Sequence, residues 1–314
     1  MSVRFAFASH TPLKDYCEVA PAVSESVESA HIDLRNWVDE YQPELVIAIG
    51  PDHFNGFFYG LMPSFCVGMS TEAVGDWNTP QGELPSSEEL ATKLLAYSHR
   101  SGVDLAYSHN MRVDHGISQF LHELFEWRML PPIIPIFVNC AAAPRPPLAR
   151  VLELGRIIGQ FARAQSLRVL VTASGGLSHD PPIPSITTAS GKLRERLIKG
   201  GDLSAEARQA RQEIVVQEAM KQRQGESLRL PLNPEWDRTF INNLQRFDFD
   251  SLLSLSDEDI TSAAGCGAHE IRAWLTGASA AKECGITKLD LLLYLPIPEW
   301  VAGYGIMRGQ IMKD

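Results

Sequence analysis

The sequence lacks the cysteine pairs, long apolar runs and signal segments that mark several large classes of protein. Its 314 residues include five cysteines, and no two show C-x-x-C spacing, so neither a disulfide framework nor a zinc ribbon is indicated. The longest apolar runs, at residues 45–49 and 133–138, are far too short to span a membrane. The first residues are apolar over too short a stretch for a signal peptide, so a reducing, cytoplasmic location is expected.

Basic residues are also in deficit. The chain has 28 Lys and Arg against 38 Asp and Glu, which gives a formal net charge of −10, and it has no basic run. Nucleic-acid binding is therefore excluded, and an anionic substrate would need a local basic pocket that opposes the field of the whole protein. With 45% hydrophobic residues the chain can bury a large core, which excludes disorder.

Three common motifs of nucleotide and ester chemistry are missing. No Lys-Ser/Thr pair follows the glycines of residues 174–176, so they are not a phosphate loop. The G-x-S-x-G elbow of hydrolases is missing around Ser178, although His179 is adjacent. The first apolar run is not followed by G-x-G-x-x-G, which argues against a dinucleotide cofactor.

Apolar runs alternate with amphipathic segments, which predicts an α/β fold. The runs read as buried strands at residues 3–8, 45–49, 65–69, 133–138 and 168–172. Helical spacing of apolar residues lies between them, and Ser86 with Glu89 predicts a capping box at the start of one helix. We expect a central mixed or parallel sheet that is flanked by helices on both faces.

The strand signal fades after about residue 184. The stretch 193–224 is charged and helical, and Ser256 followed by three acidic residues predicts the start of another helix. We therefore predict a single domain over residues 1–314. It would comprise an α/β body at about 1–183, a mainly helical cap segment packed on the core at about 184–290, and a C-terminal return to the core at about 291–314.

Four of the nine histidines follow predicted strands or open the next helix. They are His10, His53, His115 and His179. Because ligands of open α/β sheets bind beyond the carboxyl ends of the strands, these imidazoles are expected to share one rim. A single histidine in such a place is usually structural, but four at one rim indicate a site.

Two chemistries remain open at this rim. Neutral imidazoles with one carboxylate suit non-haem Fe(II) and oxygen chemistry, whereas three nitrogen ligands favour zinc. Spare imidazoles would serve as proton donor and acceptor. Spacing alone does not divide the four histidines into ligands and acid/base groups, and it does not choose the carboxylate among Glu270, Glu283 and Glu299.

Seven ordered segments resemble the class III (LigB-type) extradiol ring-cleaving dioxygenases, closest to the branch that acts on 3-(2,3-dihydroxyphenyl)propionate and 2,3-dihydroxycinnamate. The resemblance spans about residues 3–305. The segments are residues 7–12 (FASHTP), 51–58 (PDHFNGFF), 113–116 (VDHG), 174–179 (SGGLSH), 232–237 (LNPEWD), 268–274 (AHEIRAW) and 297–303 (IPEWVAG).

This resemblance implies a role for each matching residue. His10, His53 and Glu270 correspond to the ligands of Fe(II), and His115 and His179 to the acid/base pair. It further implies two supporting residues. Asp114 would orient the adjacent imidazole of His115, and Pro181 would hold the loop that presents His179. Asp180 is an extra anion beside His179 that could raise the pKa of that imidazole.

The resemblance also implies the reaction. Both atoms of O2 would enter the catechol ring, giving 2-hydroxy-6-oxo-nona-diene-dioate in aromatic catabolism, in a protein that is expected to be a homo-oligomer. The alternatives are another catechol of the protocatechuate or gallate type, a LigB-like binding protein without catalysis, and a zinc hydrolase. The substrate carboxylate needs a cation or amide donors. Arg112 lies near the site in sequence, but no residue is assigned this role.

Overall fold

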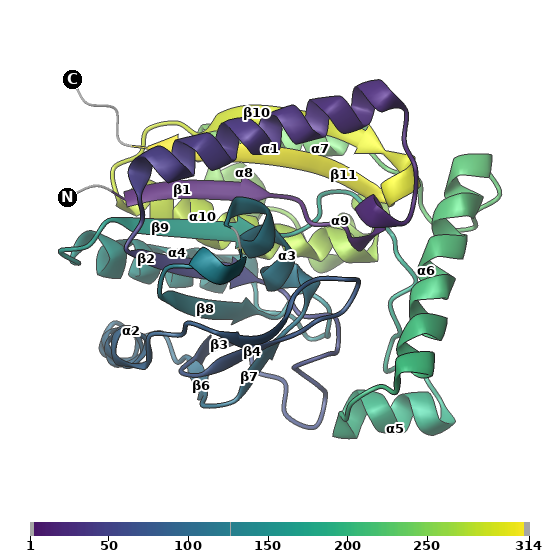
Figure 1. Cartoon of the computed structure of the whole chain (residues 1–314), viewed down its shortest axis with the longest axis horizontal. Helices are drawn as coiled ribbons and strands as arrows, with labels where there is room; N and C mark the ends of the chain where they lie inside the picture. Colours follow the sequence, from purple (N-terminus) through teal and green to yellow (C-terminus); the bar gives the residue numbers. More distant parts are fainter. Residues whose placement is uncertain (1–2, 126, 311–314) are drawn as a thin grey trace.

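The computed structural model describes residues 3–125 and 127–310, except for the side chains of Arg128 and Ala205. Over this part, eight strands form one mixed sheet in the order β10-β11-β1-β9-β2-β8-β3-β6 (Figure 1). No helix in the described ranges is long and apolar enough to cross a bilayer.

The centre of the sheet is parallel. It consists of β1 (Val3–Ala8), β9 (Val169–Ser174), β2 (Leu45–Gly50) and β8 (Ile133–Val138). These strands are buried almost throughout, as expected for parallel strands covered on both faces. The prediction of four central strands from apolar runs is confirmed, and their carboxyl ends lie at one edge.

Outer strands complete the sheet through three antiparallel pairs and one parallel pair, β3 with β6. On one side β11 (Ala302–Gln310) pairs with β1 and with β10 (Asp290–Ile297); on the other, β3 (Phe65–Gly68) pairs with β8 and β6 (Ala106–Ser108) with β3. A small second sheet holds β5 (Gln81–Leu84), β4 (Thr71–Val74) and β7 (Met111–Val113). The return of the chain to the core at about residue 291 therefore takes the form of two strands.

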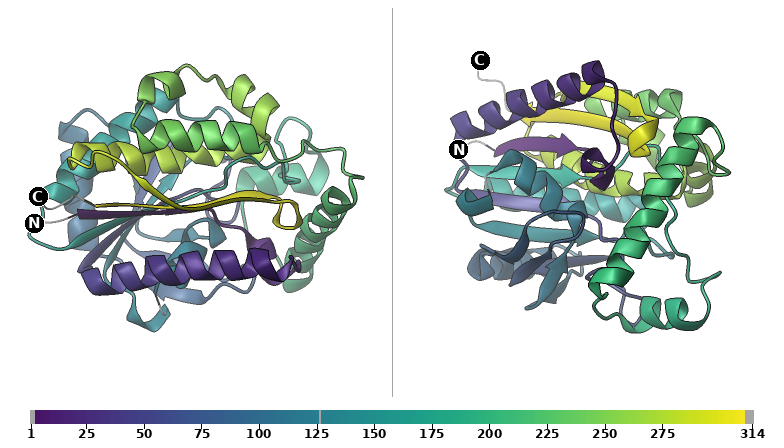
Figure 2. Two further views of the ribbon diagram at one scale, coloured as in Figure 1. Left: turned by 90° about the horizontal axis from the view of Figure 1, so that it is seen from above. Right: turned by 45° about the vertical axis from the view of Figure 1, so that its right-hand side comes forward.

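Helices cover both faces of the large sheet. On one face lie α1 (Pro21–Tyr41) and α3 (His115–Leu124), and on the other lie α4 (Leu148–Arg163) and α10 (Ile271–Glu283) (Figure 2). The second face is extended by α2 (Glu88–Arg100), α7 (Pro234–Gln245), α8 (Phe249–Leu253) and α9 (Asp257–Ala264). Side chains alternate along each central strand, so each face has its own apolar cluster.

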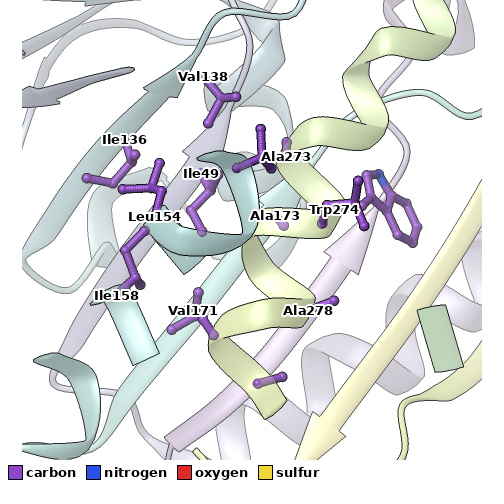
Figure 3. Close-up of a cluster of buried hydrophobic side chains, with 14 of the residues drawn as sticks. Ile49, Ile136, Val138, Leu154, Ile158, Val171, Ala173, Ala273, Trp274 and Ala278 are labelled. Carbon is purple, nitrogen blue, oxygen red and sulfur yellow. The ribbon is translucent and has the colours of Figure 1, made fainter. Parts of the chain in front are cut away.

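The larger cluster fixes α10, which begins directly after Glu270. Ile49, Val171 and Ala173 of the sheet meet Leu154 of α4 and Ala273 of α10 in this cluster (Figure 3). Small residues of both helices let the two backbones approach closely, since a Cβ at Gly155 or Gly159 would collide with the backbone of α10. This packing holds the start of α10 against the sheet.

The predicted helical cap segment divides into two parts. Two helices, α5 (Gly191–Lys199) and α6 (Ala205–Gln224), lie beyond the carboxyl ends of the strands at the right of Figure 1. The others, α7 to α10, pack on the sheet itself. Short 3-10 turns occur at η1 (Pro12–Asp15), η2 (Trp127–Met129), η3 (Cys266–Glu270) and η4 (Pro298–Trp300).

Candidate active site

Three predicted site residues converge beyond the carboxyl ends of β1, β2 and β9. His10 follows β1, His53 follows β2, and Glu270 ends η3. Nε2 of His10 lies 3.3 Å from one carboxylate oxygen of Glu270, and Nε2 of His53 lies 3.0 Å from the other. Glu283 and Glu299, the other two candidate carboxylates, are not part of this cluster: Glu283 accepts a bond from Gln160, and Glu299 lies in η4.

Both imidazoles are held by their far nitrogen. Nδ1 of His10 lies 2.9 Å from Oγ of Ser174, and Nδ1 of His53 lies 3.1 Å from Asp114. Partners at Nδ1 commonly orient metal-binding histidines, because they fix the ring and leave Nε2 for the metal. A pair of such imidazoles with one carboxylate is the donor set that non-haem Fe(II) takes, so these residues fit a metal.

The charge states of His10 and Glu270 also suit a cation, whereas Asp114 and Glu270 hold the pKa of His53 well above its usual value despite burial. Burial lowers the pKa of His10 to about 3, which leaves its imidazole neutral with a free lone pair. Burial alone would raise the pKa of Glu270, but His10, His179 and His53 hold it well below its usual range. Neutral imidazole and ionised carboxylate are the forms that bind metal ions.

The predicted partner of Asp114 is wrong. Its carboxylate caps α3 through the N–H of Gly116, but it bonds the backbone N–H and ring of His53 and the amide of Asn55 rather than the ring of His115. The ring of His115 is instead held by Asp76, whose carboxylate lies 2.6 Å from Nδ1 and also accepts the backbone N–H of His115. Asp76 is a site residue that the sequence analysis missed.

His115 stands directly against the cluster. Its ring stacks on that of His53 with 4.3 Å between centroids, and it lies 5.4 Å from the ring of His10. The three imidazoles therefore also form a compact group of nitrogen donors. The geometry leaves the zinc alternative open to direct test.

His179 completes the rim from the loop after β9. Its Nδ1 donates to the carbonyl of Leu177 at 2.9 Å, and its Nε2 lies 3.6 Å from Glu270. The ring is enclosed by Gly176 and Gly267, where an added Cβ would overlap it. Gly176 and Gly267 thus leave room for the imidazole.

Replacing Gly267 with alanine is expected to displace the ring of His179 without touching a metal ligand. Since a misplacement of about 1 Å can cost about 10²-fold in rate, we expect the rate of the reaction at this site to fall by about that factor while bound metal stays at the wild-type level. Steady-state kinetics and metal analysis check this. In a His179→Ala background the same change should add little, and equal losses in both backgrounds would contradict it.

Asp237 braces the loop of His179 from α7. Its fully buried carboxylate accepts the N–H and the hydroxyl of Ser178 and the hydroxyl of Tyr294, each at 2.7 Å. Burial raises the pKa of Asp237, and these bonds oppose the rise. The loop is thereby tied to α7 and β10.

We expect Asp237→Asn to destabilise the protein by about 1–3 kcal/mol. The carboxylate accepts three hydrogen bonds, whereas the NH2 group of the new amide is a donor and would face donors that have lost their acceptor. Urea denaturation measures this free energy of unfolding. Asp104→Asn, on an exposed loop, is the matched control and should change it by less than about 0.5 kcal/mol. An unchanged free energy of unfolding in Asp237→Asn would show that Asp237 does not stabilise this loop.

Asp180 and Pro181, the next two residues of this loop, bind backbone groups around it. Asp180 accepts the N–H groups of Cys266 and Leu230, so it ties η3 to the loop instead of facing the ring of His179. The pKa of His179 is raised despite burial, by the carboxylate of Glu270 and by the bond to the carbonyl of Leu177. The carbonyl of Pro181 accepts from Arg229 and Ile183, as a residue that shapes the loop would.

A cavity of about 360 Å³ opens on the histidines. Its walls include His10, His53, His115 and His179, the aromatic rings of Trp77 and Trp300, prolines 181, 182 and 184, and part of α6. The volume is within the range of small-molecule sites, which are mostly apolar with a few polar groups. Trp274, in contrast, is fully buried and donates to the carbonyl of Gly175.

Comparison with known proteins agrees with this arrangement. The family model described as "Catalytic LigB subunit of aromatic ring-opening dioxygenase" matches residues 4–305. A protein of Photorhabdus laumondii named 2,3-dihydroxyphenylpropionate/2,3-dihydroxicinnamic acid 1,2-dioxygenase is 41% identical over 310 residues, which are 99% of this chain and 98% of that protein. One of the same name from Paraburkholderia xenovorans is 41% identical over 314 residues, 100% and 99% of the two chains.

A solved structure shares the fold. The chain titled "Crystal structure of uncharacterized protein JW3007 from Escherichia coli K12" superposes with a TM-score of 0.53 at 13% identity, covering 98% of this chain and 99% of the other. At this identity the likeness concerns the fold alone.

Proposed function

Because the chain belongs to the LigB family of aromatic ring-opening dioxygenases, we propose that it opens the ring of 3-(2,3-dihydroxyphenyl)propionate and 2,3-dihydroxycinnamate. It is an extradiol dioxygenase, which cleaves beside the two hydroxyl groups and inserts both atoms of O2. The observation that carries the proposal is the convergence of two imidazoles on the carboxylate of Glu270, together with two further imidazoles that line the same cavity as the first two.

LigB dioxygenases depend on a metal, and in this chain His10, His53 and Glu270 would hold it, with Fe(II) as the ion. Fe(II) supplies the exchange of single electrons with O2 and an aromatic diol that a protein side chain cannot provide. The protein in turn fixes the ligands: Ser174 and Asp114 orient the rings, and the N–H of Gly176 bonds Glu270 at 2.5 Å.

His115 and His179 would move the protons. Each ring has its Nδ1 engaged, by Asp76 and by the carbonyl of Leu177, so Nε2 is the atom left to exchange a proton with the diol or the developing product. One imidazole takes a hydroxyl proton as the diol binds, and the other gives a proton to an oxygen atom during ring opening. Asp76 would hold His115 in the required tautomer, as a carboxylate commonly does for a catalytic histidine.

Oxygen uptake with a panel of catechols tests the proposal. Anaerobically purified, ferrous-loaded protein should consume one O2 per 3-(2,3-dihydroxyphenyl)propionate and form a yellow ring-opened product. Uptake with protocatechuate or gallate instead would keep the reaction class and change the substrate. No uptake with any catechol would leave the binding protein or the zinc hydrolase. Size-exclusion chromatography of the same preparation tests the expected homo-oligomer.

A further inference from the structure

We propose that Arg208 and Arg211 of α6 bind the carboxylate on the side chain of the substrate. This assignment rests on the proposed function of the cavity and extends it to the group that distinguishes a dihydroxyphenylpropionate from a plain catechol. Neither arginine stands near a histidine in sequence, and α6 brings both to the cavity.

Five residues of α6 line the cavity, and all of them except Ile214 follow one helical spacing. Arg208, Arg211, Gln212 and Val215 are separated by three, one and three positions, so they share one face of the helix. That helix lies beyond the carboxyl ends of the central strands, where the histidines gather (Figure 1). One substrate molecule in the cavity can therefore meet both the histidines and this helix face.

Each guanidinium is anchored by one bond and has donors to spare. Nη1 of Arg208 donates to the carbonyl of Val74 at 3.2 Å, and Nη2 of Arg211 donates to the carbonyl of His53 at 2.7 Å. Because a guanidinium carries five N–H donors in a planar fork, each retains enough to meet a carboxylate. The bond from Arg211 sets its charge beside a proposed metal ligand.

Neither guanidinium is neutralised by an ion pair. Within residues 3–125 and 127–310, both make their hydrogen bonds to carbonyl groups, and no carboxylate forms an ion pair with either. The three carboxylates whose charges act on Arg211 are already engaged: Asp114 holds the ring of His53, Asp52 accepts three backbone N–H groups of its own loop, and Asp76 holds His115.

A third arginine adds to the positive field. Arg196 of α5 donates to the carbonyl of Phe54, and burial together with the charges of Arg211 and Arg208 lowers the pKa of Arg196 to about 10. Two guanidinium groups in the cavity wall of a chain of net charge −10 are local cations of the kind that an anionic substrate requires. The apolar neighbours Leu203 and Pro182 suit the hydrocarbon part of such a side chain.

The kinetic test compares substrates with and without the carboxylate. In Arg208→Met, KM for 3-(2,3-dihydroxyphenyl)propionate should rise about 10- to 100-fold, the range for one charged hydrogen-bond partner, while KM for 3-methylcatechol and both kcat values change less than about threefold. Arg211→Gln should impair both substrates, because Arg211 also holds the carbonyl of His53. Arg223→Met, exposed on the last turn of the same helix, is the matched control.

A binding test separates this inference from the proposed reaction. Quenching of Trp77 and Trp300, which line the cavity, reports binding of 3-phenylpropionate and of the uncharged 3-phenylpropanol without O2 or turnover. Wild-type protein and Arg208→Lys should prefer the acid, and Arg208→Met should lose that preference. Equal affinity of wild-type protein for both compounds, or equal kinetic loss with both catechols in Arg208→Met, would overturn the assignment. If wild-type protein consumes no O2 with any catechol yet prefers the acid, the proposed reaction fails and the carboxylate site stands.

Discussion

His115→Ala should lower kcat for ring cleavage by about 10²–10⁴-fold and leave the iron content at the wild-type level. The range is that of general acid/base catalysis by one positioned group, and the unchanged iron follows from the proposed ligand set His10, His53 and Glu270. The ring of His115 stacks on His53 but is held by Asp76, so its loss removes a proton carrier and no proposed ligand. Steady-state kinetics with metal analysis of the same sample measures both quantities.

Two further variants keep this prediction testable. Removing the ring leaves the buried carboxylate of Asp76 without its partner, so His115→Gln is made as well, which retains an N–H donor but cannot carry a proton at neutral pH. His122→Ala, exposed on the same helix, should behave as wild type. If iron were lost in parallel with activity in both His115 variants, His115 would be a metal ligand. The set of three imidazoles, His10, His53 and His115, would then replace the proposed ligand set.

Glu270→Gln should abolish stable iron binding. The carboxylate faces Nε2 of both His10 and His53, and it is the only negatively charged member of the proposed ligand set. Loss of an outer-shell partner typically weakens metal binding 10–100-fold, so loss of a charged ligand should exceed about 100-fold. Anaerobic competition with a ferrous chelator measures the change.

Glu299→Gln is the matched control for this experiment. It removes the same charge from another glutamate of the C-terminal region that lies in η4 rather than in the cluster. In Glu270→Gln the N–H of Gly176 can still donate to the side-chain amide oxygen, so the loop should stay folded, which circular dichroism checks. Iron affinity equal to wild type in Glu270→Gln would show that the cation is held elsewhere.

The central fold could be predicted because its strands are buried on both faces. The runs at 3–8, 45–49 and 133–138 needed no tertiary knowledge, since parallel strands under two helical layers are apolar throughout. The strands of the small sheet were missed. Its member Gln81–Leu84 is short and largely polar, so pairing with β4 rather than its own sequence makes it a strand.

The predicted N-cap residue is correct at one helix and wrong by one residue at another. Ser256 begins α9 with a full capping box, as its three following carboxylates indicated. At α2 the N-cap is Ser87, whose hydroxyl accepts the N–H of Leu90, instead of the adjacent Ser86. Two successive serines offer the same chemistry, and the bridge of Ser86 to Ile133 decides between them.

The rim of histidines followed from strand ends, but the partners of those histidines did not. Asp114 is adjacent to His115 in sequence and yet bonds the ring of His53, while Asp76 arrives from a loop 39 positions away. The position of Arg208 and Arg211 in the cavity wall could not be predicted, because α6 carries charge on several sides. No single polar stripe marks the face of the helix that meets the cavity. Such pairings are set by tertiary packing, which sequence spacing does not encode.

The most direct test of the account is the metal dependence of oxygen consumption. Metal-free protein is loaded anaerobically with Fe(II) in one sample and with Zn(II) in another, and both are mixed with 3-(2,3-dihydroxyphenyl)propionate and O2. The account predicts one O2 consumed per substrate, with the ring-opened product, in the ferrous sample alone. Equal consumption in both samples, or none with bound Fe(II), would contradict it.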